Sequence, residues 1–292
     1  MLALATAVLA PADARGTVTI GSNLNRVPTV FTGCDPSCTR VPASLTPGAL
    51  AAGGLSSPVN GMVVTWRIRV GSASAPVTFR VVRRFPGDLA TGAGTSATVM
   101  PPVQSITAFP VRLPIAIRDS IGVDCCVGGG GAIGVSGGSG TTDFWLPALA
   151  DGAAPRARFQ FGPQDMFETA INADIEPTSA FTISAIKLGK GGKVTVTATL
   201  PNPGTLTGGD KRDPSLAAAA GKGKGKGKQR YLKRSTMPVG VAGQTIRLLV
   251  RPTKRARALV KEKGSLKAKL KVVFTPTGGN PTTQVLKVRL KR

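Results

Sequence analysis

Apolar residues recur at every second position in parts of the last third of the chain, with cations at most of the positions between them. The alternation occupies residues 246–251, 266–274 and 286–291. Successive side chains of a β-strand point to opposite faces, so this period of two predicts strands with one apolar and one wetted face. Such strands, separated by short turns, predict an antiparallel sandwich, and the length of residues 178–292 suits an immunoglobulin-like one.

The cations of the last two segments fall on the wetted face. Residues 276–281 are rich in Pro, Gly and Asn and are expected to join the two segments as a hairpin. If the wetted faces align, like charges lie opposite each other and destabilise the sheet unless an anionic partner neutralises them. We therefore predict a polyanion-binding surface, the alternative being that the cations only keep the domain soluble. Its residues are Lys267, Lys269, Lys271, Lys287, Arg289 and Lys291.

Charge is distributed very unevenly along the chain. No lysine precedes Lys187, and the formal charge is +1 up to Ile186 and +23 beyond it. A composition step of this kind predicts a domain boundary, which we place between residues 15–177 and 178–292. An excess this large repels itself unless salt or a polyanion neutralises it.

The first domain is also expected to be all-β. Runs of β-branched residues recur between Gly, Pro, Ser and Asn, and little of the region has a helical period. In the strand expected at Met62–Val70, Val64, Trp66 and Ile68 share one face, so Trp66 is predicted to be core. The predicted fold class is all-β, with two antiparallel β-sandwich domains, the first jelly-roll-like and the second immunoglobulin-like.

A glycine-rich segment, Gly128–Gly140, is predicted to be a loop. Within it, Gly129, Gly131 and Gly134 have the spacing of a dinucleotide-binding motif. That motif requires a helix that begins at the third glycine and directs its amides at a pyrophosphate, and residues 135–138 cannot begin one. The match is therefore rejected, and no cofactor is expected.

A second low-complexity segment, Gly208–Pro238, is predicted to be one long disordered insert. It could reach an anionic surface or serve as a solvated spacer. A short helical crossover is expected at Lys254–Lys263. The cations of the insert are Lys222, Lys224, Lys226 and Lys228.

The first residues and the cysteines favour export. Residues 1–14 resemble a signal peptide, although the basic start of such a peptide is missing and the start is therefore expected to be truncated. Cys34 and Cys38 are the preferred disulfide pair, while pairing across to Cys125 and Cys126 remains open. The chain has no histidine to complete a mixed zinc site, and no metal is expected.

The absence of histidine also excludes most hydrolase chemistry, because neither a Ser-His-Asp nor a Cys-His nucleophile can form. Asp174 and Glu176 share a predicted strand face and are the remaining option for acid-base chemistry or calcium, but a solvated domain edge explains them better. The chain is predicted not to be an enzyme. A glycan-binding module in the first domain would depend on an exposed Trp145.

Three stretches together resemble a layout found in secreted bacterial proteins: residues 61–69, 171–177 and 274–279. In that layout a jelly-roll-like β domain precedes an immunoglobulin-like module. The resemblance supports the expected fold and implies no catalytic or binding residue.

These features predict an exported extracellular or cell-envelope protein, expected to be a monomer. Its partner is expected to be an anionic envelope polymer or a lipid surface. Nucleic acid is disfavoured by export and by the few aromatic residues, and it would become the first choice if the chain were not exported.

Overall fold

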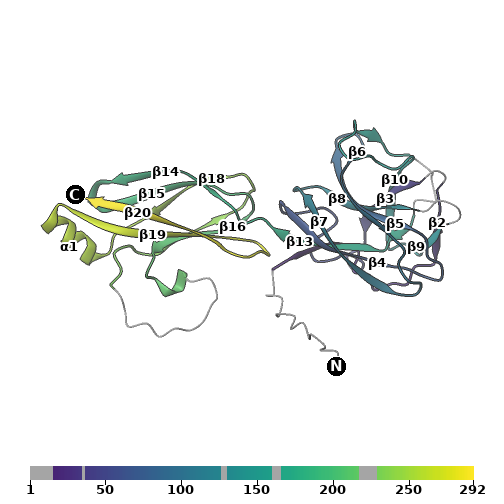
Figure 1. Ribbon diagram of the computed structural model, residues 1–292, viewed down its shortest axis with the longest axis horizontal. Helices are drawn as coiled ribbons and strands as arrows, with labels where there is room; N and C mark the ends of the chain where they lie inside the picture. Colours follow the sequence, from purple (N-terminus) through teal and green to yellow (C-terminus); the bar gives the residue numbers. More distant parts are fainter. Residues whose placement is uncertain (1–15, 35–36, 126–129, 160–165, 217–228) are drawn as a thin grey trace, which may run out of the picture.

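The computed structural model describes residues 16–34, 37–125, 130–159, 166–216 and 229–292. Strands make up 57% and helices 6%, so the prediction of an all-β protein is confirmed. Figure 1 shows two lobes of strands placed end to end along the long axis. The connection between them lies between β13, which ends at Pro177, and β14, which begins at Thr182.

In the described part of the first lobe there are thirteen strands. They are β1 (Val18–Gly21), β2 (Val30–Thr32), β3 (Cys38–Leu45), β4 (Gly61–Arg69), β5 (Val77–Phe85), β6 (Leu89–Val99), β7 (Ile106–Ile115), β8 (Ser120–Cys125), β9 (Gly131–Val135), β10 (Gly140–Trp145), β11 (Arg156–Ala157), β12 (Glu168–Thr169) and β13 (Ile171–Pro177). They form antiparallel sheets in the orders β1-β13-β4-β7, β10-β3-β8-β5-β6-β11 and β12-β9-β2.

The first two of these sheets enclose a common apolar core. Trp66 on β4 is 1% exposed and stacks on Phe79 of β5, with ring centroids 5.3 Å apart. The prediction that Trp66 is core is therefore confirmed. A bulge in β4 alters the expected face: the register against β13 and β7 shifts near Val63–Thr65, so that Val63 is buried and Val64 is not.

The glycine-rich segment forms a strand where the sequence predicted a loop. β9 pairs with both β2 and β12. A Cβ atom on Gly134 would lie 2.8 Å from the Phe167 ring and 2.9 Å from Val30, so glycine is needed for this close approach. No helix begins at Gly134, which agrees with rejecting the nucleotide motif. Residues 126–129, including Gly129 and Cys126, lie outside the described residues.

Outside residues 217–228, the second lobe has seven strands and one α-helix. They are β14 (Thr182–Gly189), β15 (Lys193–Thr199), β16 (Gly204–Asp210), β17 (Ser235–Val239), β18 (Thr245–Val250), α1 (Lys254–Lys263), β19 (Ser265–Pro276) and β20 (Thr282–Lys291), with short 3₁₀ turns at Lys190–Gly192 and Pro214–Leu216. Antiparallel pairing gives sheets in the orders β14-β15-β18 and β17-β16-β19-β20.

The alternating residues of these strands divide as the sequence predicts. Their apolar side chains form a core between the two sheets, with Val196, Leu248, Leu270 and Phe274 fully buried. The helix α1 has the predicted bounds. Thr253 accepts a hydrogen bond from the Ala256 amide at its start, and the left-handed Gly264 (φ 73°) ends it.

The predicted single insert at 208–238 is wrong at both ends. β16 continues through Asp210, and β17 begins at Ser235 and pairs with β16. Both strand segments were assigned to the loop because glycine and proline usually mark loops. Gly208 and Gly209 lie in β16, and Pro238 lies in β17. The central cations Lys222, Lys224, Lys226 and Lys228 lie outside the described residues.

Reciprocal asparagine hydrogen bonds join the two lobes. The Asn60 amide donates to Asn202 Oδ1 (2.6 Å), and Asn202 Nδ2 donates to the Asn60 carbonyl (2.9 Å) and to the Thr178 carbonyl (2.7 Å). Asn202 is fully buried. These bonds couple the first lobe to the start of the second.

Candidate functional site

The β19–β20 hairpin brings its cations into direct opposition. In its register Lys267 lies opposite Arg289 and Lys269 lies opposite Lys287. All four side chains are exposed. Like charges opposite each other on one face of a sheet cost stability, about 0.2–1 kcal/mol per pair. The hairpin therefore carries two unfavourable pairs next to each other.

The other two predicted cations of the hairpin lie outside these pairs. Lys271 is half-buried and faces Val285, while the exposed Lys291 faces Ser265. The structure thus concentrates the predicted surface into two rows near the α1 end of the hairpin.

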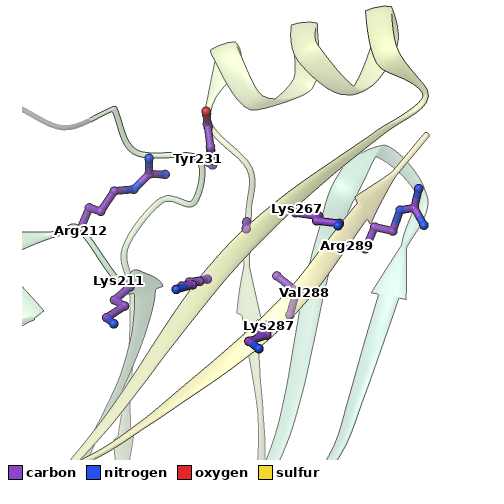
Figure 2. A pocket seen from close by; sticks show the side chains of 9 residues that line it. Lys211, Arg212, Tyr231, Lys267, Lys287, Val288 and Arg289 are labelled. Atoms are coloured by element: carbon purple, nitrogen blue, oxygen red, sulfur yellow. The ribbon is translucent and has the colours of Figure 1, made fainter.

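The paired cations border a hollow of about 770 Å³ (Figure 2). Ala268 and Val288, the positions between the cations, also line it. Its other wall is built from Lys211, Arg212 and Tyr231, three residues that the sequence did not identify as part of the site. Lys211 is held beside the hairpin because its amide donates to the Lys269 carbonyl (2.9 Å).

A buried carboxylate positions this second wall. Asp210 is fully buried and accepts two hydrogen bonds of 2.8 Å from Arg212, one from Nε and one from Nη2, and a third of 2.6 Å from the Tyr231 amide. The Arg212 guanidinium lies 4.4 Å from the centre of the Tyr231 ring. The two hydrogen bonds to Asp210 fix the guanidinium over the ring, at a distance typical of a cation–π contact.

The same contacts shift two pKa values. Burial would raise the pKa of Asp210, but the hydrogen bonds from Arg212 and from the amides of Tyr231 and Arg212 outweigh it and hold this pKa below its usual value. The hydrogen bonds to Asp210 raise the pKa of Arg212. Arg212 and Asp210 therefore form a stable ion pair, and the net charge of the hollow comes from the other cations.

Few carboxylates are available to neutralise those cations. Residues 187–292 contain only three acids. Asp210 pairs with Arg212 and Asp213 with Arg230 (3.2 Å), while Glu262 lies on α1. Within the ranges that the structure describes, no lysine takes part in an ion pair.

The first lobe shows the opposite arrangement, because its arginines pair with its own acids. The buried Arg80 binds Asp124 and Asp151, and Asp143 accepts from both Arg84 and Arg158. These ion pairs and the net charge of +1 distinguish this lobe from the second, which has a large excess of cations.

The prediction that Trp145 is exposed is wrong. Its side chain is 1% exposed, packs with Val41, Val82, Ala90 and Leu149, and donates from Nε1 to the Arg156 carbonyl (3.1 Å). A buried indole with a satisfied N–H offers no face to a sugar. The sequence of β10 alone does not indicate that residues distant in the chain, such as Val82 and Leu149, cover the Trp145 side chain.

Asp174, one of the two carboxylates considered for acid-base chemistry, is held by side chains of β1 and β4. Asp174 accepts from Arg67 Nη2 and Thr19 Oγ1 at 2.6 and 2.7 Å. Burial would raise its pKa, but these hydrogen bonds outweigh burial and keep the pKa below its usual value. Among the described residues, no group of three His, Cys, Asp or Glu side chains is arranged to hold a metal ion.

The predicted Cys34–Cys38 disulfide is present, with the two Cα atoms 5.8 Å apart. Cys125 is buried beside it, and the Cys38 sulfur lies 3.5 Å from the Cys125 carbonyl oxygen. This disulfide closes the local loop at the start of β3.

Comparisons with known proteins add no relative. A scan against protein-family models finds no match to the chain, and a search of curated proteins finds no significant match. In the part of the chain that is described, no helix has both the length and the apolar character needed to span a bilayer.

Proposed function

We propose that this chain is an exported, non-enzymatic protein of the cell envelope or extracellular space whose second lobe binds a polyanion. The observation that carries the proposal is the direct opposition of Lys267 with Arg289 and of Lys269 with Lys287. The arrangement costs folding stability in the free protein and is offset when an anion lies over it.

The size of the two effects favours a binding role. Basic residues close to an anionic surface each contribute about 1 kcal/mol at moderate salt. The four paired cations would therefore gain about 4 kcal/mol from an anionic partner, more than their mutual repulsion costs. An anionic envelope polymer fits this surface better than a flat lipid headgroup layer does, because the cations surround a hollow.

The strand arrangement supports the finer fold assignment that we propose for each lobe. Sheets of three and four antiparallel strands around one core are typical of immunoglobulin-like sandwiches. The two larger sheets of the first lobe fit a jelly-roll-like domain. Neither assignment carries the functional proposal.

Export is part of the proposal and has separate support. The apolar start of the chain resembles a signal peptide, and the Cys34–Cys38 disulfide suits an oxidising compartment. Fractionation of the native host tests it: the protein should be found in the envelope or medium, and a wash with about 1 M salt should release the envelope fraction. Recovery in the cytosol would contradict export and bring nucleic acid forward as the ligand.

Binding is tested with the full chain and poly(glycerol phosphate) at several salt concentrations. A variant with Lys267, Lys269, Lys287 and Arg289 all changed to Gln should bind at least about 100-fold more weakly at low salt. The control changes four exposed cations around the opposite sheet to Gln and so has the same net charge: Lys187, Lys193, Arg247 and Arg251. Equal losses in both variants would show that only net charge matters and would contradict the proposed site.

A further inference from the structure

We infer that the hollow beside the hairpin binds a sugar ring that carries a phosphate or sulfate group, as a unit of the polymer. This inference rests on the proposed polyanion-binding function and specifies the chemistry of its ligand. It distinguishes an anionic saccharide from a chain that offers charges alone, such as polyphosphate or an acidic peptide.

The first argument is the shape of the site. A run of charges needs only a basic strip, whereas the cations here border a hollow of about 770 Å³ (Figure 2). That volume lies within the range of roughly 300–1,000 Å³ of sites that enclose small molecules. It has room for sugar rings as well as for their charged substituents.

The second argument is the spacing of the charges around the floor. Alternate residues on a strand lie about 7 Å apart, and directly opposed Cβ atoms lie about 5 Å apart. Lys267, Lys269, Lys287 and Arg289 therefore stand at the corners of a rectangle, with Ala268 and Val288 between them. A ligand that fills the site needs an uncharged framework between its anionic groups, which a sugar ring provides.

The third argument is the second wall. Asp210 already neutralises Arg212, so Arg212 and Tyr231 add a flat, rigid surface to the hollow and little net charge. Figure 2 shows these two side chains across the hollow from Lys267 and Arg289. The hydroxyls of a sugar can hydrogen-bond with the Tyr231 hydroxyl at the edge of this wall. Polyphosphate would leave the wall unused.

The same geometry disfavours a nucleic acid. Bases bind single-strand proteins by stacking on open aromatic faces. The guanidinium of Arg212 covers one face of the Tyr231 ring, and the ring also packs against the core of the second lobe. The hollow therefore presents a covered ring where base stacking needs a free one.

The composition of the chain provides a specific probe. Tyr231 is its only tyrosine, so incorporation of 3-fluorotyrosine gives one ¹⁹F resonance, located in the hollow. The labelled full chain is titrated at low salt with a sulfated heparin tetrasaccharide, a phosphorylated maltooligosaccharide, a linear polyphosphate of matched charge and oligothymidylate. Affinities are measured in parallel by calorimetry on the unlabelled protein.

We expect both saccharides to shift the resonance and to bind at least about tenfold more tightly than polyphosphate. Tyr231→Phe keeps the ring and removes the hydroxyl, so it should weaken saccharide binding about three- to tenfold and leave polyphosphate binding unchanged. A difference between the two saccharides would identify whether phosphate or sulfate is preferred.

Several results would overturn the inference. Equal affinities for polyphosphate and saccharides, or saccharide binding that leaves the ¹⁹F resonance unmoved, would show that the hollow does not recognise a sugar while the polyanion function stands. Tightest binding by oligothymidylate would replace the saccharide with a nucleic acid. Failure of all four ligands to bind at low salt would instead refute the proposed function itself.

Discussion

The opposed cations of the hairpin lead to a prediction in which stability and binding change in opposite directions. In Lys269→Glu, the residue across from Lys287 changes from a like charge to an opposite one. Removing the repulsion and adding an attraction each contribute about 0.2–1 kcal/mol, so the variant should be more stable by about 0.4–2 kcal/mol. Binding to poly(glycerol phosphate) should weaken at the same time.

Lys271→Glu is the matched control. Lys271 lies two residues further along the same strand and faces Val285, so the substitution makes the same charge change with no cation directly opposite. Its stability gain should be smaller. The difference between the two variants isolates the direct pair from the reduction in net charge.

The assay is urea unfolding of the full chain, because guanidinium is itself a salt that would screen the charges. The advantage of Lys269→Glu over Lys271→Glu should shrink in about 1 M NaCl, where the screening length is about 3 Å. If Lys269→Glu is no more stable than Lys271→Glu at low salt, the opposed cations do not strain the hairpin and the argument for a binding role fails.

Three other predictions concern the buried Asp210 of the site, the core of the first lobe and the junction between the lobes. Because the folded pKa of Asp210 lies below its usual value of 3.8, its stabilisation is complete above that pH and is lost as the pH falls through the folded pKa. Asp210→Asn should therefore cost about 1.5–3 kcal/mol at neutral pH and flatten the acid limb of the stability profile, measured by urea unfolding. Trp145→Ala should cost about 3–5 kcal/mol in the same assay without changing saccharide binding, and a stable variant that loses glycan affinity would contradict its buried position. Asn202→Ala should speed hydrogen exchange at the Asn60 amide, and unchanged exchange would show that the lobes are joined by other contacts.

The alternating patterns predicted most of the second lobe because each strand has one buried and one wetted face. Such strands give a clear period of two, and β19 and β20 pair as the expected hairpin with their wetted faces aligned. The bounds of α1 were predictable for a similar reason: Ala256 and Val260 are four residues apart and face the core, and Gly264 ends the helix.

The failures have local physical causes. The bulge in β4 moves the buried position from Val64 to Val63. A prediction that assumes strict alternation along the strand cannot anticipate the extra residue of a bulge. The strand β9 was predicted to be a loop because it lies in a glycine-rich segment. Gly134 is needed there for close packing against Phe167 and Val30. Composition alone does not distinguish a glycine that permits close packing from one that permits a turn.

The second wall of the hollow was missed because tertiary contacts create it. Lys211 and Arg212 follow the end of β16 inside a segment that resembles a spacer, and Tyr231 lies 19 residues after Arg212. Only the buried Asp210, which binds both Arg212 and the Tyr231 amide, brings them together. The sequence hint for this wall was the spacing of Asp210 and Arg212, two residues apart, which allows the two side chains to pair.

The most direct test of the central claim is a lysine footprint. Every lysine lies in residues 187–292, so reductive methylation read by mass spectrometry reports on all of them in one experiment, with and without poly(glycerol phosphate). We expect protection of Lys211, Lys267, Lys269 and Lys287, with Lys187 and Lys193 unchanged. Equal protection of all the lysines, or protection confined to residues 222–228, would contradict a binding site on the β19–β20 hairpin.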